Sequence, residues 1–394
     1  MTSVVQYTKA QKLQIDADFP GGNIKMLSID GDTVKIKQDA RDTDGWWFYW
    51  SFRVRGAEGR TLNFVFANDV IGTQETAVNK EAYWPSSWDD VISTRGPAVS
   101  SDGMNWHWLS NKTGASRKKF SYTFGADEKE VYFSQCINHT EKNLNLFLEK
   151  YKKHPALKVK TLCKSEKGRN VELLRIGKNK APFKVFLSSR HHSGETMGTY
   201  AMEGIIETIL SDTEDGKWLR DNVDFFMVPF VDKDGVEDGD QGKNRKPHDH
   251  NRDYIQRKRH SVKAITEQVP KWADGKPLFV MDLHCPWYRG NDESIYFFAK
   301  SLREEVQRFG AILEKERKGT IPYWERNNRF LPSRDPNLQR CDEWGATLPN
   351  AVFSATLEVS FANAEGDIVV DANSTRKLGN DLAHAIRAYL ETLK

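Results

Sequence analysis

The stretch "FKVFLSSRHHSGETMGTYAMEGIIETILSD", from Phe183 to Asp212, contains an expected strand, a turn and an expected helix in direct succession. Its first seven residues form an apolar run that is typical of a strand, and the residues after Thr196 place apolar side chains at helical spacing. The turn between them carries His191, His192 and Glu195. A strand that leads straight into a helix predicts an α/β unit, in which ligands bind outside the carboxyl ends of the strands.

The same alternation of strands and helices extends from about Val131 to the C-terminus. The nearly continuous apolar runs at 223–231 and 277–284 are typical of parallel strands that are buried on both faces. We therefore predict a mixed, largely parallel sheet flanked by helices. The further expected strands are 131–136, 171–177, 294–300 and 352–361, and the further expected helices are 140–154, 301–318 and 375–393.

The first 120 residues have a different pattern. Short alternating or aromatic-rich runs at 33–40, 46–56 and 61–69 are separated by Gly, Asn and Asp, and amphipathic helices are missing. This predicts an N-terminal antiparallel β-sandwich domain over residues 1–125, followed by the α/β domain over residues 126–394. The aromatic run at 45–54 favours a core strand over a platform that binds sugars or peptides.

Composition excludes several classes of function. The formal net charge is only +3, with acids and bases interspersed, so no nucleic-acid-binding stripe is indicated. No signal peptide and no apolar run of about 20 residues is found, and we expect a cytoplasmic protein without a membrane partner. No CxxC pair occurs, which argues against a thiolate zinc site and a disulfide framework; the cysteines are Cys136, Cys163, Cys285 and Cys341.

His192 and Glu195 form an HxxE pair that is able to converge on one metal ion. A zinc hydrolase needs a third ligand and an open position, and His284 at the end of the strand 277–284 is the candidate, with Asp282 beside it to orient the site. Each signal is weak by itself. An acidic residue such as Glu195 is also favoured in the first turn of a helix for electrostatic reasons.

The segment 228–254 lies between these two groups and ends in "HNRDY". Asn251 and Arg252 have the chemistry to hold a carboxylate, because a guanidinium pairs with it through two parallel hydrogen bonds and an amide adds another donor. Arg245 is a candidate for polarising a carbonyl group. Taken alone, the segment also fits a polar surface loop with local ion pairs.

At this point the sequence resembles the M14 zinc carboxypeptidases, and most of all their cytosolic branch, whose members have a β-sandwich ahead of the catalytic domain. The resemblance covers about 270 residues. It rests on five motifs, which occur in the family's order along about 170 of these residues. These motifs are "HSGE" at 192–195, "VPFVDKDGV" at 228–236, "HNRDY" at 250–254, "DLH" at 282–284 and "ATLEVSF" at 355–361.

The resemblance implies a role for each matching residue. One zinc ion would be held by His192, Glu195 and His284, and Glu358 in "ATLEVSF" would act as the general base. Asn251 and Arg252 would grip the C-terminal carboxylate of the substrate. Arg245 would stabilise the oxyanion, although its spacing to "HNR" is shorter than expected. Independently, a buried strand glutamate such as Glu358 is costly without a partner.

The sequence departs from the family pattern at the mobile tyrosine that binds the substrate terminus. No clear match occurs between residues 320 and 349, where Tyr323 is the one candidate. In the same region Arg329, Arg334 and Arg340 suggest a preference for an acidic C-terminal residue.

The main prediction is therefore a zinc-dependent metallocarboxypeptidase that acts on the C-terminus of a peptide or protein. One alternative is a zinc amidase or deacylase acting on acyl-amino acids or cell-wall peptides, which would not need a free C-terminal carboxylate. Another is a catalytically inactive binding protein, which would not need zinc. The oligomeric state is not predicted.

Overall fold

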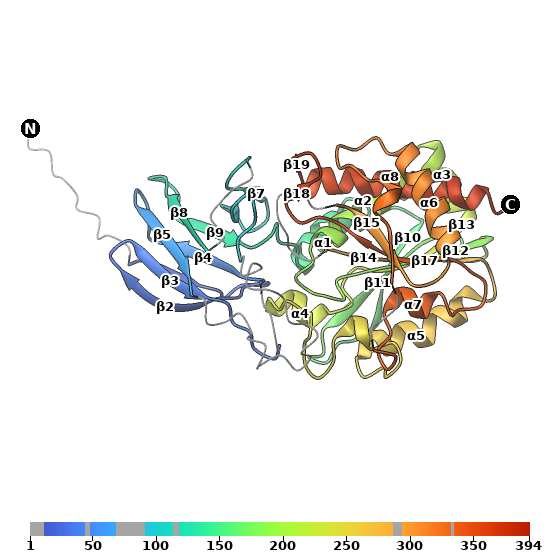
Figure 1. The fold of residues 1–394 in the computed structure, drawn as a ribbon, viewed down its shortest axis with the longest axis horizontal. Helices are drawn as coiled ribbons and strands as arrows, with labels where there is room; N and C mark the ends of the chain where they lie inside the picture. The colour runs from blue at the N-terminus through green and yellow to red at the C-terminus, as the bar shows by residue number, and fades with distance from the viewer. Residues whose placement is uncertain (1–11, 44–47, 68–90, 113–117, 287–293, 332–334) are drawn as a thin grey trace, which may run out of the picture.

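The computed structural model describes residues 12–43, 48–67, 91–112, 118–286, 294–331 and 335–394. Two units follow each other along the chain, as Figure 1 shows: an N-terminal unit of strands and a larger C-terminal unit of strands and helices. None of the helices within these ranges is long and apolar enough to span a membrane.

Two sheets make up the N-terminal unit. The larger sheet has the strand order β1-β4-β9-β6-β7, and all its pairings are antiparallel. The smaller sheet has the order β2-β3-β5-β8 and contains one parallel pairing, between β3 and β5. The bounds are β1 Gln14–Asp16, β2 Lys25–Asp30, β3 Thr33–Lys37, β4 Ser51–Arg55, β5 Thr61–Phe66, β6 Ala98–Ser100, β7 His107–Trp108, β8 Lys119–Thr123 and β9 Glu130–Ser134.

An apolar core lies between the two sheets, so the predicted β-sandwich is confirmed. Phe52 of β4 and Phe133 of β9 contact Phe64 of β5, with ring centroids 5.3 and 5.4 Å apart. Trp50 is fully buried in the same core. The described part of the aromatic run at 45–54 therefore supplies core residues, as predicted; residues 45–47 lie outside the described residues.

Strand β9 belongs to the N-terminal unit, because it pairs with β4 and β6. The sheet of this unit thus extends one strand beyond the boundary predicted at residue 125. An apolar run predicts a strand but does not show which sheet the strand joins. The sequence interpretation therefore assigned 131–136 to the α/β unit that follows.

The C-terminal unit is built on an eight-stranded mixed sheet with the order β10-β11-β13-β12-β14-β17-β15-β16. The central strands β13, β12, β14 and β17 are parallel, as the apolar runs predicted, and the antiparallel pairings lie toward the edges. The bounds are β10 Leu157–Lys164, β11 Asn170–Gly177, β12 Phe183–Ser189, β13 Val223–Val228, β14 Leu278–His284, β15 Tyr296–Ala299, β16 Arg329–Phe330 and β17 Ala351–Glu358. A short hairpin follows, formed by β18 Asn363–Ala364 and β19 Ile368–Val369.

Helices cover both faces of this sheet (Figure 1). Alternate side chains of each central strand point to opposite faces. Val185 and Leu187 of β12 therefore join the core under α2, α6 and α8, while Phe186 joins the core under α5 and α7. The bounds are α1 Glu141–Glu149, α2 Met197–Leu210, α3 Glu214–Asn222, α4 Lys233–Asp238, α5 His260–Ala273, α6 Arg303–Glu316, α7 Cys341–Gly345 and α8 Ala372–Glu391, with short 3-10 helices at His250–Arg252 and Glu325–Asn327.

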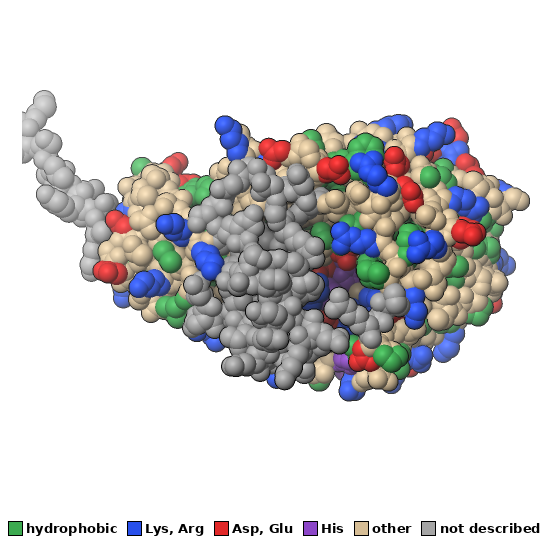
Figure 2. Space-filling view, in the orientation of Figure 1, with side chains coloured by type: hydrophobic (Ala, Val, Ile, Leu, Met, Phe, Trp, Pro, Cys, Tyr) green, Lys and Arg blue, Asp and Glu red, His purple; other side chains and the backbone are tan. Residues whose placement is uncertain are grey.

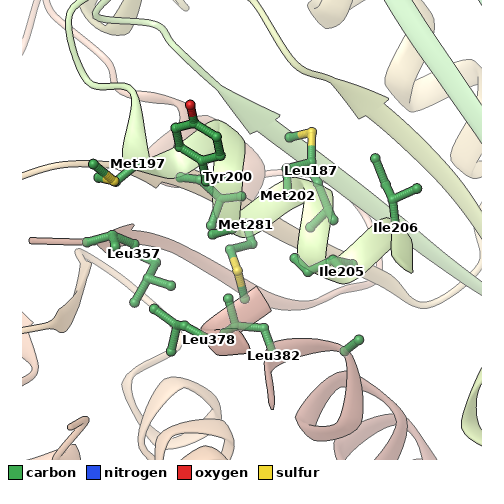
Figure 3. Packing of buried hydrophobic residues seen from close by; sticks show 14 of the residues in the cluster. Leu187, Met197, Tyr200, Met202, Ile205, Ile206, Met281, Leu357, Leu378 and Leu382 are labelled. Carbon is green, nitrogen blue, oxygen red and sulfur yellow. The ribbon is translucent and has the colours of Figure 1, made fainter. Parts of the chain in front are cut away.

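The start of α2 is fixed by the larger of these two cores. Met197 and Ile205 of α2 pack with Met281 of β14, Leu357 of β17 and Leu382 of α8, as Figure 3 shows. All five side chains are at most 1% exposed. This packing holds the turn between β12 and α2 against the ends of two neighbouring strands.

Candidate metal centre

The predicted metal ligands meet because three neighbouring parallel strands end side by side. Strand β12 leads into the turn that carries His192 and Glu195, β14 ends at His284, and β17 ends at Glu358. His284 and Glu358 are register partners, so their side chains point to the same face of the sheet. In Figure 2, histidine side chains are visible in a hollow of the molecular surface, with acidic and basic side chains beside them.

His192, Glu195 and His284 form a compact buried group. The Nδ1 atom of His192 lies 2.9 Å from Glu195 Oε1, and the Nδ1 atom of His284 lies 2.7 Å from Glu195 Oε2. One ligand atom from each residue lies within 4.8 Å of the other two. Two imidazole nitrogens and a carboxylate oxygen are a donor set that zinc hydrolases use, so these residues fit a zinc ion.

The outer nitrogen of each histidine faces a buried aspartate. His284 Nε2 lies 2.6 Å from Asp282 Oδ2, and His192 Nε2 lies 3.3 Å from Asp249 Oδ1. Such carboxylates fix the tautomer and orientation of a metal-binding histidine and make its inner nitrogen a stronger ligand. Asp282 was predicted to orient the site, but Asp249 was not. Its position two residues before Asn251 in "DHNRDY" was the available signal.

His191, which had no role in the sequence interpretation, supports Asp282. Its Nδ1 lies 2.9 Å from Asp282 Oδ1, and its Nε2 lies 2.8 Å from the hydroxyl of Tyr254. His191, Asp282 and His284 are a second group with metal-binding spacing. Because the carboxylate that His191 contacts also faces the outer nitrogen of His284, we interpret His191 as a support for this aspartate and not as a ligand.

The carboxyl groups of the site fall into two groups, those with a lowered pKa and one with a raised pKa. Although burial raises the pKa of Glu195, the charges of His192, Lys243 and His284 hold that pKa well below its usual range. The pKa of Asp282 is likewise lowered, because His191 and His284 outweigh the effect of burial. Burial raises the pKa of Glu358, and the nearby charge of Glu195 adds to the rise. A carboxylate with a raised pKa is suited to taking up a proton.

Glu358 has a buried carboxylate oxygen, Oε2, that makes no hydrogen bond within the described part of the chain. An unpaired buried oxygen is costly. The oxygen lies beside His284, and a role in accepting a proton or a hydrogen bond during a reaction would explain why this cost is tolerated.

Asn251 lies next to the metal group, and Arg252 follows it at the end of the 3-10 helix His250–Arg252. Asn251 is buried: its side-chain oxygen Oδ1 accepts a hydrogen bond from the Cys341 backbone N–H, and its Nδ2 is 3.2 Å from His284 Nε2. Arg252 is half-buried and donates to the backbone oxygen of Asn251. Among the described residues no carboxylate lies within 4.0 Å of the Arg252 guanidinium, so its charge faces no direct ion-pair partner there.

Arg245 lies in surroundings that differ from those expected of an oxyanion-binding residue. Its guanidinium is paired with three carboxylates, those of Asp42 at 3.1 Å, Asp232 at 2.6 Å and Asp240 at 3.0 Å. Asp42 belongs to the N-terminal unit, so this cluster joins the two units. The geometry therefore gives Arg245 a structural role, and the predicted oxyanion role has no support from it.

The residues considered for substrate preference are also engaged elsewhere. Tyr323 is fully buried in the core, and its hydroxyl donates to Asn328 at 3.0 Å, so it does not face the metal group. Arg340 is buried and pairs with Asp342 at 2.9 Å. Arg329 lies over the ring of Tyr296, 4.0 Å from its centroid. Arg334 lies outside the described residues.

Comparison with known proteins agrees with this geometry. The model of the family described as "Zinc carboxypeptidase" matches residues 144–275, and the model described as "Cytosolic carboxypeptidase N-terminal domain" matches residues 15–135. In sequence the chain is thus similar to the M14 family of zinc carboxypeptidases. The predicted resemblance to its cytosolic branch is confirmed by the match to the N-terminal model.

One relative in this branch is cytosolic carboxypeptidase 2 of Xenopus tropicalis, which is 33% identical over 276 residues, covering 61% of this chain and 27% of the relative. The chain spans between 27% and 54% of the length of the first curated relatives that it matches.

Solved metallo-carboxypeptidase structures share the whole architecture, including the N-terminal unit. A metallo-carboxypeptidase from Burkholderia cenocepacia superposes with a TM-score of 0.77 at 19% identity, covering 98% of this chain and all of the other. A metallo-carboxypeptidase from Pseudomonas aeruginosa also gives 0.77, at 21% identity, covering 97% and 100%. At these identities the likeness establishes the fold.

Proposed function

We propose that the chain is a zinc-dependent carboxypeptidase that removes C-terminal residues from peptides or proteins. The observation that carries the proposal is the buried group of His192, Glu195 and His284, with the Glu358 oxygen Oε2 beside it, which is buried and makes no hydrogen bond within the described part of the chain. Zinc, when bound by these three residues, supplies Lewis-acid chemistry that lowers the pKa of a water and polarises a carbonyl group.

In this proposal Glu358 moves the proton. It accepts a proton from the attacking water and delivers it to the nitrogen of the leaving amino acid. Its raised pKa matches it to both steps, because a carboxylate with a very low pKa would be a poor base. Its place at the end of a buried strand also fixes its position relative to His284.

Arg252 and Asn251 are proposed to hold the C-terminal carboxylate of the substrate. A guanidinium binds a carboxylate through two hydrogen bonds, and that of Arg252 has no carboxylate partner in the described part of the chain. Such binding would make the enzyme an exopeptidase, because only the last residue of a chain carries this group.

A preference for acidic C-terminal residues remains a prediction. Arg340 pairs with Asp342. Of the arginines considered for this preference, Arg329 is the one within the described residues that has no acidic partner within 4.0 Å. The names of the relatives support a cytoplasmic location and a peptide substrate, with one zinc ion per chain proposed. We propose neither a nucleic-acid nor a membrane partner.

The test is a pair of peptide libraries that differ only at the C-terminus, one with free carboxylates and one with amides, incubated with the zinc-loaded chain and analysed by mass spectrometry. We expect single C-terminal residues to be lost from the free acids, and at least 100-fold more slowly from the amides, because a charge-assisted hydrogen-bond pair is lost. Equal cleavage of both libraries would favour the amidase or deacylase. Cleavage of neither, with zinc bound, would favour a binding protein.

A further inference from the structure

Arg190 stands two residues before the first metal ligand, and neither the sequence interpretation nor the proposed function gives it a role. Only 2% of its surface is exposed. Its backbone has a φ of +59°, in the left-handed region that residues other than glycine rarely adopt. A buried arginine in this conformation is unfavourable in two ways, so the contacts around it have to hold it in place.

The guanidinium of Arg190 bridges two backbone oxygens. Its Nε donates to the Ser193 oxygen at 2.7 Å, Nη2 is directed to the same oxygen, and Nη1 donates to the His139 oxygen at 2.9 Å. Its central carbon lies 5.6 Å from the centroid of the Phe230 ring. Within the described residues, no carboxylate lies within 4.0 Å of this guanidinium. Backbone oxygens and an aromatic ring thus hold its charge, and an ion pair does not.

A buried cation without an acidic partner is costly, because burial takes it out of water. Two other buried arginines, Arg95 and Arg245, do have such partners, which include Asp367 and Asp232. What Arg190 offers in return is geometry. The guanidinium is a planar fork with several donors, and it is able to reach two separate backbone segments at once.

One of these segments, residues 136–139, connects β9 to α1 and lies along the turn between β12 and α2. The hydroxyl of Thr196 donates to the Ile137 oxygen at 2.7 Å, at the end of the turn. Arg190 donates to the His139 oxygen at the start of the turn. The connecting segment is therefore fastened to both ends of the turn.

His192 and Glu195 lie between these two fastened ends. Ser193, whose backbone oxygen accepts from Arg190, separates them in the sequence, and the Glu195 N–H donates to the His192 oxygen at 3.1 Å. The backbone of the turn is thus held at its ends and in its middle. A turn held in this way presents both ligands in one arrangement before a metal binds, which reduces the conformational entropy lost on binding.

We infer that Arg190 is a positioning residue of the metal centre: by holding the Ser193 oxygen, it fixes the turn that presents His192 and Glu195 to the metal. This inference rests on the zinc site of the proposed function. The competing explanation is that Arg190 stabilises the fold and nothing more. Loss of a residue that only stabilises the fold lowers the free energy of unfolding but leaves the zinc affinity of the folded chain unchanged.

The test uses the full chain as folded apoprotein. Arg190→Met removes the guanidinium and keeps an unbranched side chain, and Arg190→Lys keeps the charge without the fork. Arg95→Met is the matched control, because Arg95 is also fully buried and donates to backbone oxygens, those of Ala362 and Asn111, which lie outside the turn. Zinc affinity is measured by competition with a chelator, and stability is measured by urea denaturation.

For Arg190→Met we expect the zinc dissociation constant to rise about 10–100-fold, as it does when a group that orients metal ligands is removed. Arg190→Lys should lose less, but at least about threefold, because an ammonium group is too compact to reach both oxygens as the fork does. Arg95→Met should lower stability and keep the zinc dissociation constant within threefold of wild type. With cobalt(II) in place of zinc, the visible absorption bands should change in both Arg190 variants and stay unchanged in Arg95→Met, because these bands report the arrangement of the ligands.

A folded Arg190→Met variant with wild-type zinc affinity and cobalt spectrum would overturn the inference, however unstable it is. Equal losses of zinc affinity in Arg190→Met and Arg95→Met would overturn it as well. If Arg190→Met does not fold, Arg190→Lys decides, and wild-type affinity and spectrum in that variant contradict the inference. A wild type that binds no zinc overturns the proposed metal centre and this inference with it. A wild type that binds zinc but releases no C-terminal residue overturns the proposed function alone.

Discussion

At the scale of single residues, the metal centre is defined by which nitrogen of each histidine faces inward. The Nδ1 atoms of His192 and His284 face Glu195, and their Nε2 atoms face Asp249 and Asp282. Both aspartates keep a lowered pKa in spite of their burial, because the adjacent imidazoles favour the charged carboxylate. Both aspartates thus stay charged at neutral pH, and Asp282 is hydrogen-bonded to the outer nitrogen of His284.

The support that Asp282 gives to His284 leads to a prediction about zinc binding. Replacing Asp282 with Asn removes the charge that orients His284, and we expect zinc affinity to fall about 10–100-fold. The measurement is a competition titration of the apoprotein against a chelator of known affinity.

Asp224→Asn is the matched control, because Asp224 is also a buried aspartate, paired with Lys184 and Arg175, but lies near the start of β13 at the opposite end of the sheet. It should lower the stability of the fold and leave zinc affinity unchanged. Unaltered zinc binding by Asp282→Asn would show that this aspartate does not orient the ligand.

At the scale of elements, the site depends on the close contact between two loops: the turn after β12 and the loop after α4. Gly242 permits this contact, because its positive φ and its 2.4 Å approach to the Ser193 nitrogen exclude a Cβ atom. The contact places Lys243 on one side of the ligands, while Asp249, Asn251 and Arg252 follow on the same segment.

We therefore expect Gly242→Ala to disturb both stability and zinc binding. Ala in the left-handed conformation costs about 1–2 kcal/mol, and the clash with backbone atoms adds about 1–3 kcal/mol, for a total of about 2–5 kcal/mol in the free energy of unfolding. The measurement is urea denaturation of the apoprotein, together with a zinc titration.

Gly168 provides the control, since it has a similar φ of +80° but open space around its missing Cβ. Gly168→Ala should cost only the conformational part, about 1–2 kcal/mol, and should leave zinc affinity unchanged. Equal effects of the two substitutions would mean that the loop contact is unimportant.

Sequence reasoning predicted the parts of the site that strands position. The apolar runs at 183–189, 277–284 and 352–361 indicated buried parallel strands, and such strands bring His192, His284 and Glu358 to one edge regardless of loop structure. It did not identify Asp249 and Lys243, and it did not foresee the pairing of Arg245 with three carboxylates. These three residues lie on one loop, and their directions depend on ion pairs with distant segments, such as that of Arg245 with Asp42 in the N-terminal unit.

At the scale of the whole molecule, the two units form one structure around the site. Arg95 of the N-terminal unit is fully buried and donates to the Ala362 oxygen at 3.2 Å and to Asp367 at 2.8 Å. Trp108 donates to the Val370 oxygen at 2.7 Å. On the other side of the interface, the N-terminal unit holds the loop that carries Lys243. The β-sandwich is thus part of the framework of the metal centre.

The central claim is that one zinc ion, held by His192, Glu195 and His284, acts together with Glu358 as the base. The most direct measurement compares wild type with Glu358→Gln, a change that keeps the size of the side chain, for zinc content and for release of the C-terminal residue from a free-acid peptide. We predict one zinc ion per chain in both proteins and a kcat that is about 10²–10⁴-fold lower in the variant. Release at the wild-type rate by zinc-loaded Glu358→Gln would contradict the account.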